Sequence, residues 1–342
     1  QPLDLSKVTI TAGSALDLSS LSDAPAGKYG RIVQRNGHFS YENKDEAIRL
    51  MGGNLFSTEV WYKSRRDNIP VTREEFEANA VEFARATRAQ GYNCIRLHGL
   101  DLDIMRDSKQ DMVFDRETLD RWDFMLAQFK KQGIYVKYVV FSFNFYGTVP
   151  NYQSNFRGKD MHRLMYVCGR EWERGRFVRG MNQLLNHVNP YTGLAWKDDP
   201  VIAVIDCYNE KHSGPMRVNQ VAEMYPEEFK FFVEKWSAWL KSRYADTPKD
   251  QLPKSLRNGF DNPPVPGMGQ GGKDLTDDYG RFLYEITTAA NRWAVEEIRK
   301  AGFPGLVTDC HCSQLFDVAA SWSSLPSIDA HTYFMHPASG RP

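Results

Sequence analysis

The chain has 342 residues, of which 42% are hydrophobic, 13% aromatic and 25% charged, so it can bury a large core in one or two domains. Lys plus Arg and Asp plus Glu both number 43, and this balance gives no support for binding nucleic acid or an anionic membrane surface. No apolar run reaches the roughly 18 residues that a membrane-spanning helix needs.

Residues 1–45 lack helical periodicity, and within them Asn36-Gly37 separates two alternating runs over residues 29–41. This pattern predicts a β-hairpin with a tight turn. We therefore expect an N-terminal extension with a hairpin over residues 1–45, followed by a second region over residues 46–342. The first residue is Gln1, which is consistent with either a mature product after leader removal or a trimmed chain.

From residue 46 on, apolar runs typical of strands alternate with segments of helical periodicity. The clearest helix start is Thr72 with Glu75, a capping-box pair, and Gly91 and Gly133 mark helix ends. In chain order up to the fourth strand, we expect strands over residues 48–56, 92–97, 134–143 and 201–207, and helices over residues 72–90, 115–132 and 170–188.

The second half continues with a long predicted helix over residues 227–244. A Pro- and Gly-rich stretch over residues 247–273 is predicted to be a loop, either functional or a simple insertion. A helix over residues 277–300, a strand over residues 305–309 and a sixth strand over residues 328–334 follow.

An alternating order of strands and helices with short connections requires a parallel sheet. Six strands do not close a barrel, and long unpaired edges are avoided. We therefore expect an α/β fold, a (β/α)8 TIM barrel with an N-terminal β-hairpin, of which about six of the eight βα units lie in this chain and strands seven and eight follow residue 342.

The fourth predicted strand is the most informative segment, because five aliphatic residues from Val201 to Ile205 lead to Asn209-Glu210. In barrels of this type the carboxyl ends of the strands line the active site. Glu210 therefore lies where a catalytic carboxylate would be expected. The alternative is a helix start at which Asn209 acts as the cap.

The five cysteines are odd in number and favour small buried side chains over a disulfide framework. Cys310-His311-Cys312 resembles a metal ligand set, but on a strand the two thiols face one side and the imidazole the other. We expect no metal and no cofactor. The cysteines are Cys94, Cys168, Cys207, Cys310 and Cys312.

Four segments at strand ends together resemble the large clan of (β/α)8 retaining glycoside hydrolases, clan A, and within it the cellulase-like enzymes. No single segment is specific for the clan, but the four segments in this order and at strand ends are. They do not resolve the family within the clan. They are Gly52-Gly53-Asn54-Leu55, Asn93-Cys94-Ile95-Arg96-Leu97-His98, Asn209-Glu210 and Asp329-Ala330-His331-Thr332-Tyr333-Phe334.

The resemblance implies that Glu210 is the general acid/base and that Asn209 binds the sugar hydroxyl beside the anomeric carbon. It also implies that Arg96 lies near the nucleophile, with His331 and Tyr333 in the same pocket. A structural salt bridge for Arg96 and a core position for His331 are the alternatives. The clan's nucleophile is a Glu on the seventh strand, which we expect beyond residue 342.

Residues 141–144 depart from the pattern, because many cellulase-like enzymes have a histidine there, and this points to a divergent subfamily. Aromatic and polar residues on or just after strand ends are candidates for sugar stacking and hydroxyl contacts, with core packing as the alternative for each. They are Trp61, His98, Asp101, Phe145, Tyr146, His311 and Trp322.

The leading hypothesis is a secreted or periplasmic enzyme that cleaves a β-linked polysaccharide or oligosaccharide by double displacement. Its expected partners are the carbohydrate and further C-terminal parts of the same protein, with no nucleic acid and no membrane insertion. One alternative is a non-catalytic carbohydrate-binding barrel. Another, a metal-dependent hydrolase using His98, Asp101, His311 and His331, is disfavoured because residues 48–56 contain no histidine pair.

Overall fold

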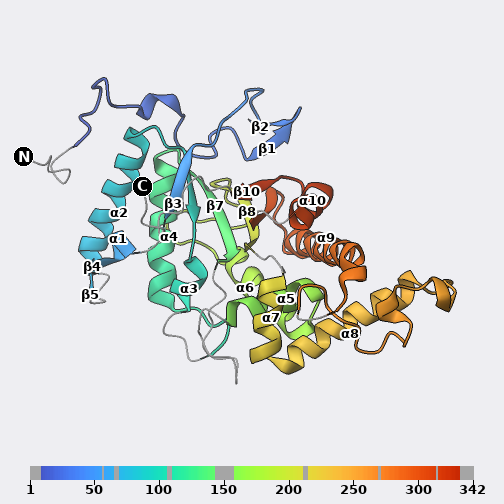
Figure 1. Cartoon of the computed structure of the whole chain (residues 1–342). Helices are drawn as coiled ribbons and strands as arrows, with labels where there is room; N and C mark the ends of the chain where they lie inside the picture. Colours follow the sequence, from blue (N-terminus) through green and yellow to red (C-terminus); the bar gives the residue numbers. More distant parts are fainter. Residues whose placement is uncertain are drawn as a thin grey trace, which may run out of the picture. The chain divides into compact units, whose positions relative to one another are not determined.

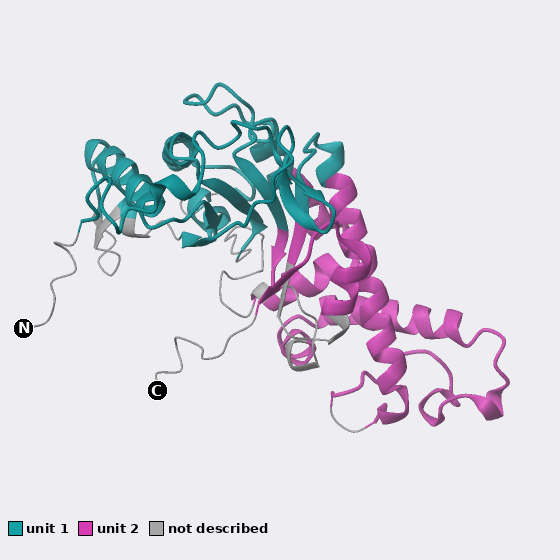
Figure 2. Ribbon diagram, turned by 90° about the horizontal axis from the view of Figure 1, so that it is seen from above, with its two compact units in different colours: residues 1–142, 180–206, 298–307 teal, residues 143–179, 207–297, 308–342 magenta. Residues whose placement is uncertain are grey.

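The computed structural model describes residues 9–55, 58–64, 69–105, 110–142, 158–210, 215–268, 271–312 and 315–331 (Figure 1). The chain divides into two compact units, each built from separate stretches of sequence (Figure 2). Unit 1 comprises residues 1–142, 180–206 and 298–307, and unit 2 comprises residues 143–179, 207–297 and 308–342.

The N-terminal hairpin is confirmed. Strands β1 (Ile32–Arg35) and β2 (His38–Tyr41) pair in antiparallel orientation. Asn36 and Gly37 between them have φ values of 51° and 79°, the left-handed conformations that a two-residue turn of this type requires. The Asn-Gly pair therefore identified the position of the turn.

The main sheet has the strand order β10-β9-β8-β7-β6-β3 within the described part of the chain. The pairs β3–β6, β6–β7 and β9–β10 are parallel, so the predicted α/β class with a parallel sheet is confirmed. Closure into an eight-stranded barrel stays a prediction. The strands are β3 (Gly52–Leu55), β6 (Cys94–Leu97), β7 (Tyr135–Phe141), β8 (Ile202–Asn209), β9 (Leu306–Cys312) and β10 (Asp329–His331), and a separate small ribbon is formed by β4 (Tyr62–Ser64) and β5 (Ile69–Pro70).

In unit 1, the helices α2 (Arg73–Ala89) and α4 (Arg116–Lys131) pack against each other. Thr72 caps α2 and forms the full predicted capping box with Glu75, and the side chain of Asp115 accepts a hydrogen bond from the backbone N–H of Thr118 at the start of α4. The shorter helices α1 (Thr58–Trp61) and α3 (Leu100–Ile104) belong to the same unit, and α6 (Glu171–Leu185) has residues in both.

Unit 2 contains helices that the sequence pattern predicts and others that it does not. Helix α8 (Pro226–Arg243) and most of α9 (Thr276–Lys300) match predicted helices, whereas α5 (Gly158–Cys168), α7 (Pro215–Met224) and α10 (Leu315–Ser324) do not. Residues 161–168 of α5 are all buried. Its sequence nevertheless carries a helical signal that our prediction missed, because Met161, Leu164, Met165 and Cys168 follow the i, i+3, i+4, i+7 spacing and belong to the core of unit 2.

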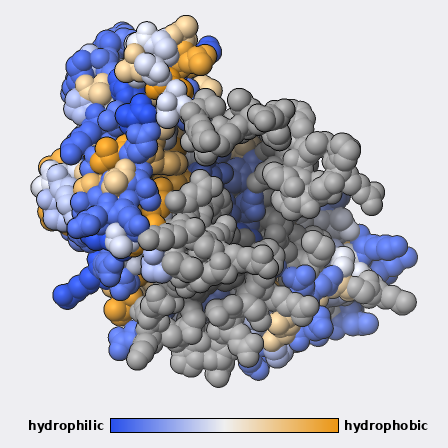
Figure 3. Space-filling view, turned by 90° about the vertical axis from the view of Figure 1, so that its left-hand side faces the viewer, coloured by the Kyte–Doolittle hydropathy of each residue, from blue (hydrophilic) through white to orange (hydrophobic). Residues whose placement is uncertain are grey.

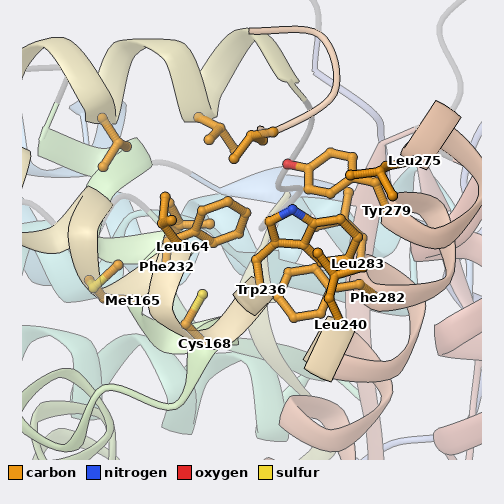
Figure 4. Close-up of a cluster of buried hydrophobic side chains, with 14 of the residues drawn as sticks. Leu164, Met165, Cys168, Phe232, Trp236, Leu240, Leu275, Tyr279, Phe282 and Leu283 are labelled. Atoms are coloured by element: carbon orange, nitrogen blue, oxygen red, sulfur yellow. The ribbon is translucent and has the colours of Figure 1, made fainter. Parts of the chain in front are cut away.

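The core of unit 2 is an aromatic and aliphatic cluster between α5, α8 and α9 (Figure 4). Trp236 lies at its centre, fully buried, and its ring centroid is 5.1 Å from that of Phe282 and 5.5 Å from that of Tyr279. The cluster fixes the Pro-rich stretch, because Trp236 donates from Nε1 to the carbonyl of Pro264 at 3.2 Å and Val265 is buried beside it.

The Pro-rich stretch is therefore an ordered cover over the core wherever the structure describes it. It contains the short 3₁₀ turns η3 (Lys249–Gln251) and η4 (Lys254–Leu256), and η5 (Lys273–Leu275) follows, whereas η2 (Ser19–Leu21) lies near the N-terminus.

No helix among the described residues is long and apolar enough to cross a membrane. On the described part of the face in Figure 3, apolar areas alternate with hydrophilic ones.

Candidate active site

Asp206 and Asn209 lie on strand β8, and Glu210 is the next residue after it. All eight residues of β8 are buried, because it is an interior strand of the sheet. Glu210 follows directly and has a φ of 52°, in the left-handed region that non-glycine residues rarely adopt. Such a conformation, held at a strand end, is typical of residues whose side-chain direction has a function.

Glu210 is in contact with His331, the last residue of β10. The Nδ1 atom of His331 lies 3.0 Å from Oε1 of Glu210, and the two side chains are 17% and 22% exposed, respectively. Neither side chain is sealed from solvent. The structure thus brings into contact two residues, 121 positions apart in the sequence, that the resemblance places in one pocket.

Arg163 of α5 binds the backbone just before Glu210. Its Nη2 donates to the carbonyl oxygen of Asn209 at 2.7 Å, and the arginine is fully buried. Asn209 itself is 4% exposed. The end of β8 is therefore tied to a helix by a charged hydrogen bond, the stronger kind.

In unit 1, a polar row crosses four strands of the sheet. Asn54, Arg96 and Lys137 are register partners on β3, β6 and β7. Arg96 Nη2 and Lys137 Nζ lie 3.2 Å and 3.3 Å from the same oxygen of Asp206 on β8, and Arg96 Nη1 donates to Asn54 Oδ1 at 3.3 Å.

Asp206 is fully buried, and burial alone would raise its pKa. The charges of Lys137 and Arg96 outweigh burial and lower the pKa below its usual value. Asp206 is therefore a permanently ionised anchor for the two cations. The Arg96–Asp206 ion pair is the structural salt bridge that we gave as the alternative role of Arg96. A position of Arg96 beside the nucleophile stays a prediction.

His98 and Asp101 lie just after β6 and are buried, with 8% and 3% exposed. Arg96 Nη1 is 3.1 Å from Nδ1 of His98. Because a guanidinium can only donate, Nδ1 accepts and the neutral imidazole carries its proton on Nε2. Asp101 accepts from the backbone N–H of Ser142 at 2.7 Å, which ties the turn after β6 to the end of β7.

The remaining predicted sugar contacts have varied environments. Trp61 is 5% exposed, and its ring packs on Phe76 and Trp122 with centroids 4.9 Å and 4.6 Å away, so it has the environment of a core residue. Trp322 on α10 is 64% exposed. His311 belongs to β9, where it is paired with Ala330, but its side chain lies outside the described part, as do Phe145, Tyr146 and Tyr333 entirely.

The described residues contain no group of three His, Cys, Asp or Glu side chains placed to hold a metal ion. The side chains of Cys310 and Cys312 are not among them. Cys168 and Cys207 are buried free thiols and Cys94 is partly buried. Burial raises the pKa of Cys94 to about 11, which makes that thiol unreactive at neutral pH.

Sequence reasoning missed three residues of this region: Asp206, Lys137 and Arg163. Asp206 and Lys137 each interrupt an apolar strand, and a charge in a buried strand requires a partner, so the pair could have been inferred. Arg163 lies in a helix that our prediction missed, and nothing in the sequence connects it with Asn209.

Comparisons with known proteins identify the fold. No family model matches the sequence, and a search of curated protein sequences finds no significant match. Among solved structures, the chain is similar to the β-galactosidase of the psychrophile Marinomonas ef1, with 14% identity, a TM-score of 0.54 and coverage of 83% of this chain and 41% of that one.

A cold-adapted β-galactosidase from Rahnella sp. R3 is similar to the same degree. It has 14% identity and a TM-score of 0.56, and the match covers 84% of this chain and 39% of that one. The chain therefore spans about two fifths of the length of these two β-galactosidase chains. At this identity the likeness shows a shared fold.

Proposed function

We propose that this chain is part of a retaining glycoside hydrolase that cleaves a β-linked poly- or oligosaccharide by double displacement, with Glu210 as the general acid/base. The observation that carries the proposal is the partly exposed Glu210–His331 pair at the end of β8. The fold shared with two β-galactosidases supports it, and makes β-galactosides the first substrates to test.

In the first step, Glu210 donates its proton to the glycosidic oxygen while a carboxylate nucleophile attacks the anomeric carbon. The leaving group departs as an alcohol, and a covalent glycosyl-enzyme remains. In the second step, ionised Glu210 removes a proton from water, which releases the sugar and restores the acid. The resemblance assigns the nucleophile to a Glu on a strand after residue 342.

His331 gives Glu210 a fixed direction in both steps. Its Nδ1 contacts Oε1, so a proton on Nδ1 can be donated to Oε1 whether Glu210 is an acid or a carboxylate. The proton for the leaving group is then carried by the other carboxyl oxygen, Oε2, and is transferred from there. Asn209 is proposed to bind the neighbouring sugar hydroxyl, Arg96 to face the nucleophile, and His98 to line the same pocket.

The test is turnover of a panel of aryl β-glycosides and β-linked polysaccharides by the full-length protein, its Glu210→Gln variant and a Glu234→Gln control. Glu234 is an exposed acid on α8. We expect Glu210→Gln to lower kcat on substrates with poor leaving groups by about 10²–10⁴-fold, with sugar binding retained, and the control to match the wild type. Unchanged turnover by Glu210→Gln would end the assignment.

A further inference from the structure

The carbonyl of Asn209 belongs to the peptide unit that enters Glu210, so its direction decides where the Glu210 side chain can point. The φ angle of Glu210 is measured against the plane of that peptide. At 52°, it places the residue in a region that costs an L-amino acid free energy. A contact that holds this peptide plane therefore holds the catalytic carboxyl group as well.

Arg163 makes that contact from a fixed position. Its guanidinium is 2.7 Å from the Asn209 carbonyl oxygen, 3.7 Å from a carboxylate oxygen of Asp160, and 5.9 Å from the ring centroid of Tyr208. The arginine is fully buried. A buried cation is costly unless it is paired and hydrogen-bonded, so these contacts restrict it to one orientation.

We infer that Arg163 is a positioning residue: it fixes the Asn209–Glu210 peptide so that Glu210 keeps its left-handed conformation and its contact with His331. The inference rests on the proposed function, since it gives Arg163 a role in catalysis through Glu210. It goes beyond that function because Arg163 lies on a helix, outside the strand ends, and its hydrogen bond to Asn209 is to the backbone.

An arginine suits this task better than a lysine. Its planar guanidinium presents several donors in a rigid arrangement, so one side chain can hold a carbonyl oxygen while it also meets a carboxylate. A lysine at position 163 would retain the positive charge but would place its donors differently. We expect Arg163→Lys to be intermediate between the wild type and Arg163→Met.

The experiment compares Arg163→Met and Arg163→Lys with a matched control, Arg174→Met. Arg174 is a partly buried arginine of the same unit that also donates to a backbone carbonyl, that of Tyr166 at 3.4 Å, and its Cζ lies 4.4 Å from the centroid of the Trp293 ring. Arg174→Met therefore removes the same kinds of contact as Arg163→Met. Arg174 is remote from β8 in the sequence, and its backbone bond is to Tyr166 and not to Asn209.

Two readouts are taken from each variant: a crystal structure of the full-length protein, and kcat and KM on the best glycoside. For Arg163→Met we expect the Glu210 φ to become negative and the His331–Glu210 contact to break. A displaced acid should lower kcat by about 10²-fold with KM little changed. Arg174→Met should retain the contact and wild-type kcat.

The structural readout separates this inference from the proposed function. An Arg163→Met structure that keeps the left-handed Glu210 and the His331 contact overturns the inference, whether or not the protein hydrolyses glycosides. A displaced Glu210 in a protein whose turnover is insensitive to Glu210→Gln refutes the proposed function and leaves the positioning intact. If Arg163→Met does not fold, the same two readouts on Arg163→Lys decide.

Discussion

Asp206 on β8 and Glu210 directly after it are carboxyl residues four positions apart, and their environments suit different tasks. Asp206 is fully buried and shared by two cations, and its pKa is lowered, so it stays ionised and cannot donate a proton near neutral pH. Glu210 has 22% of its side chain exposed and a histidine partner. Of the two, Glu210 is therefore the one that we propose as the proton donor to a substrate.

At the scale of single residues, the sequence reveals a site residue where the local composition changes from apolar to polar. Glu210 stands out because it ends an apolar run, whereas His331 was selected through the resemblance that residues 329–334 carry. Their contact depends on which strands are neighbours, which no local pattern encodes. The role of Arg163 could not be predicted, because it depends on a single bond between a helix side chain and a backbone carbonyl.

A buried carboxylate outside the site should control part of the acid stability. Burial would raise the pKa of Glu173, but Arg176, with Nη1 2.9 Å from its carboxylate, and His162, with Nδ1 at 2.7 Å, lower it to about 2. The folded pKa is thus below the unfolded one. The ionised form stabilises the fold above about pH 4.5, and that stabilisation is lost as the pH falls toward 2.

We expect the free energy of unfolding to fall by about 2 kcal/mol between pH 6 and pH 3 through this group alone. The measurement is urea denaturation at both pH values. Glu173→Gln should be less stable at pH 6, because Arg176 loses its counter-charge, and should lack this part of the pH dependence. Equal slopes with pH in the wild type and the variant would contradict the assignment.

Among the elements, helices with local end signals were predicted best. The bounds of α2 and α4 differ from the predicted ones by one residue at each end. They were predictable because the capping residues lie next to the helix ends in the sequence. Helix α5 was missed, although its Met161, Leu164, Met165 and Cys168 have the spacing of an apolar helix face. The first predicted strand was too long, since β3 contains only residues 52–55.

The cap of α2 gives a direct test at the scale of the element. The Thr72 side chain accepts from the backbone N–H of Glu75 at 3.2 Å, and the Glu75 side chain accepts from that of Thr72 at 2.8 Å. Thr72→Ala should cost about 1 kcal/mol of stability, measured by urea denaturation. Thr72→Ser retains the hydroxyl and should cost much less; equal losses in both variants would refute the cap.

For the whole molecule, the order of elements was enough to predict a parallel α/β sheet, because short crossovers leave few topologies. The division into two units could not be read from the sequence. Four of its five boundaries fall inside a helix or strand, in α6, β8, α9 and β9. Linker-like segments are the usual sign of a domain boundary, and here the Pro-rich stretch instead covers the core of unit 2.

The dependence of rate on the leaving group tests the central claim most directly. The measurement is kcat/KM of the full-length protein and of Glu210→Ala on aryl β-glycosides ranging from acidic nitrophenols to weakly acidic phenols. If Glu210 is the general acid, Glu210→Ala should lose about 10²-fold or more on the poorest leaving groups and little on the best. An equal loss across the whole series would contradict the assignment of Glu210 as the proton donor.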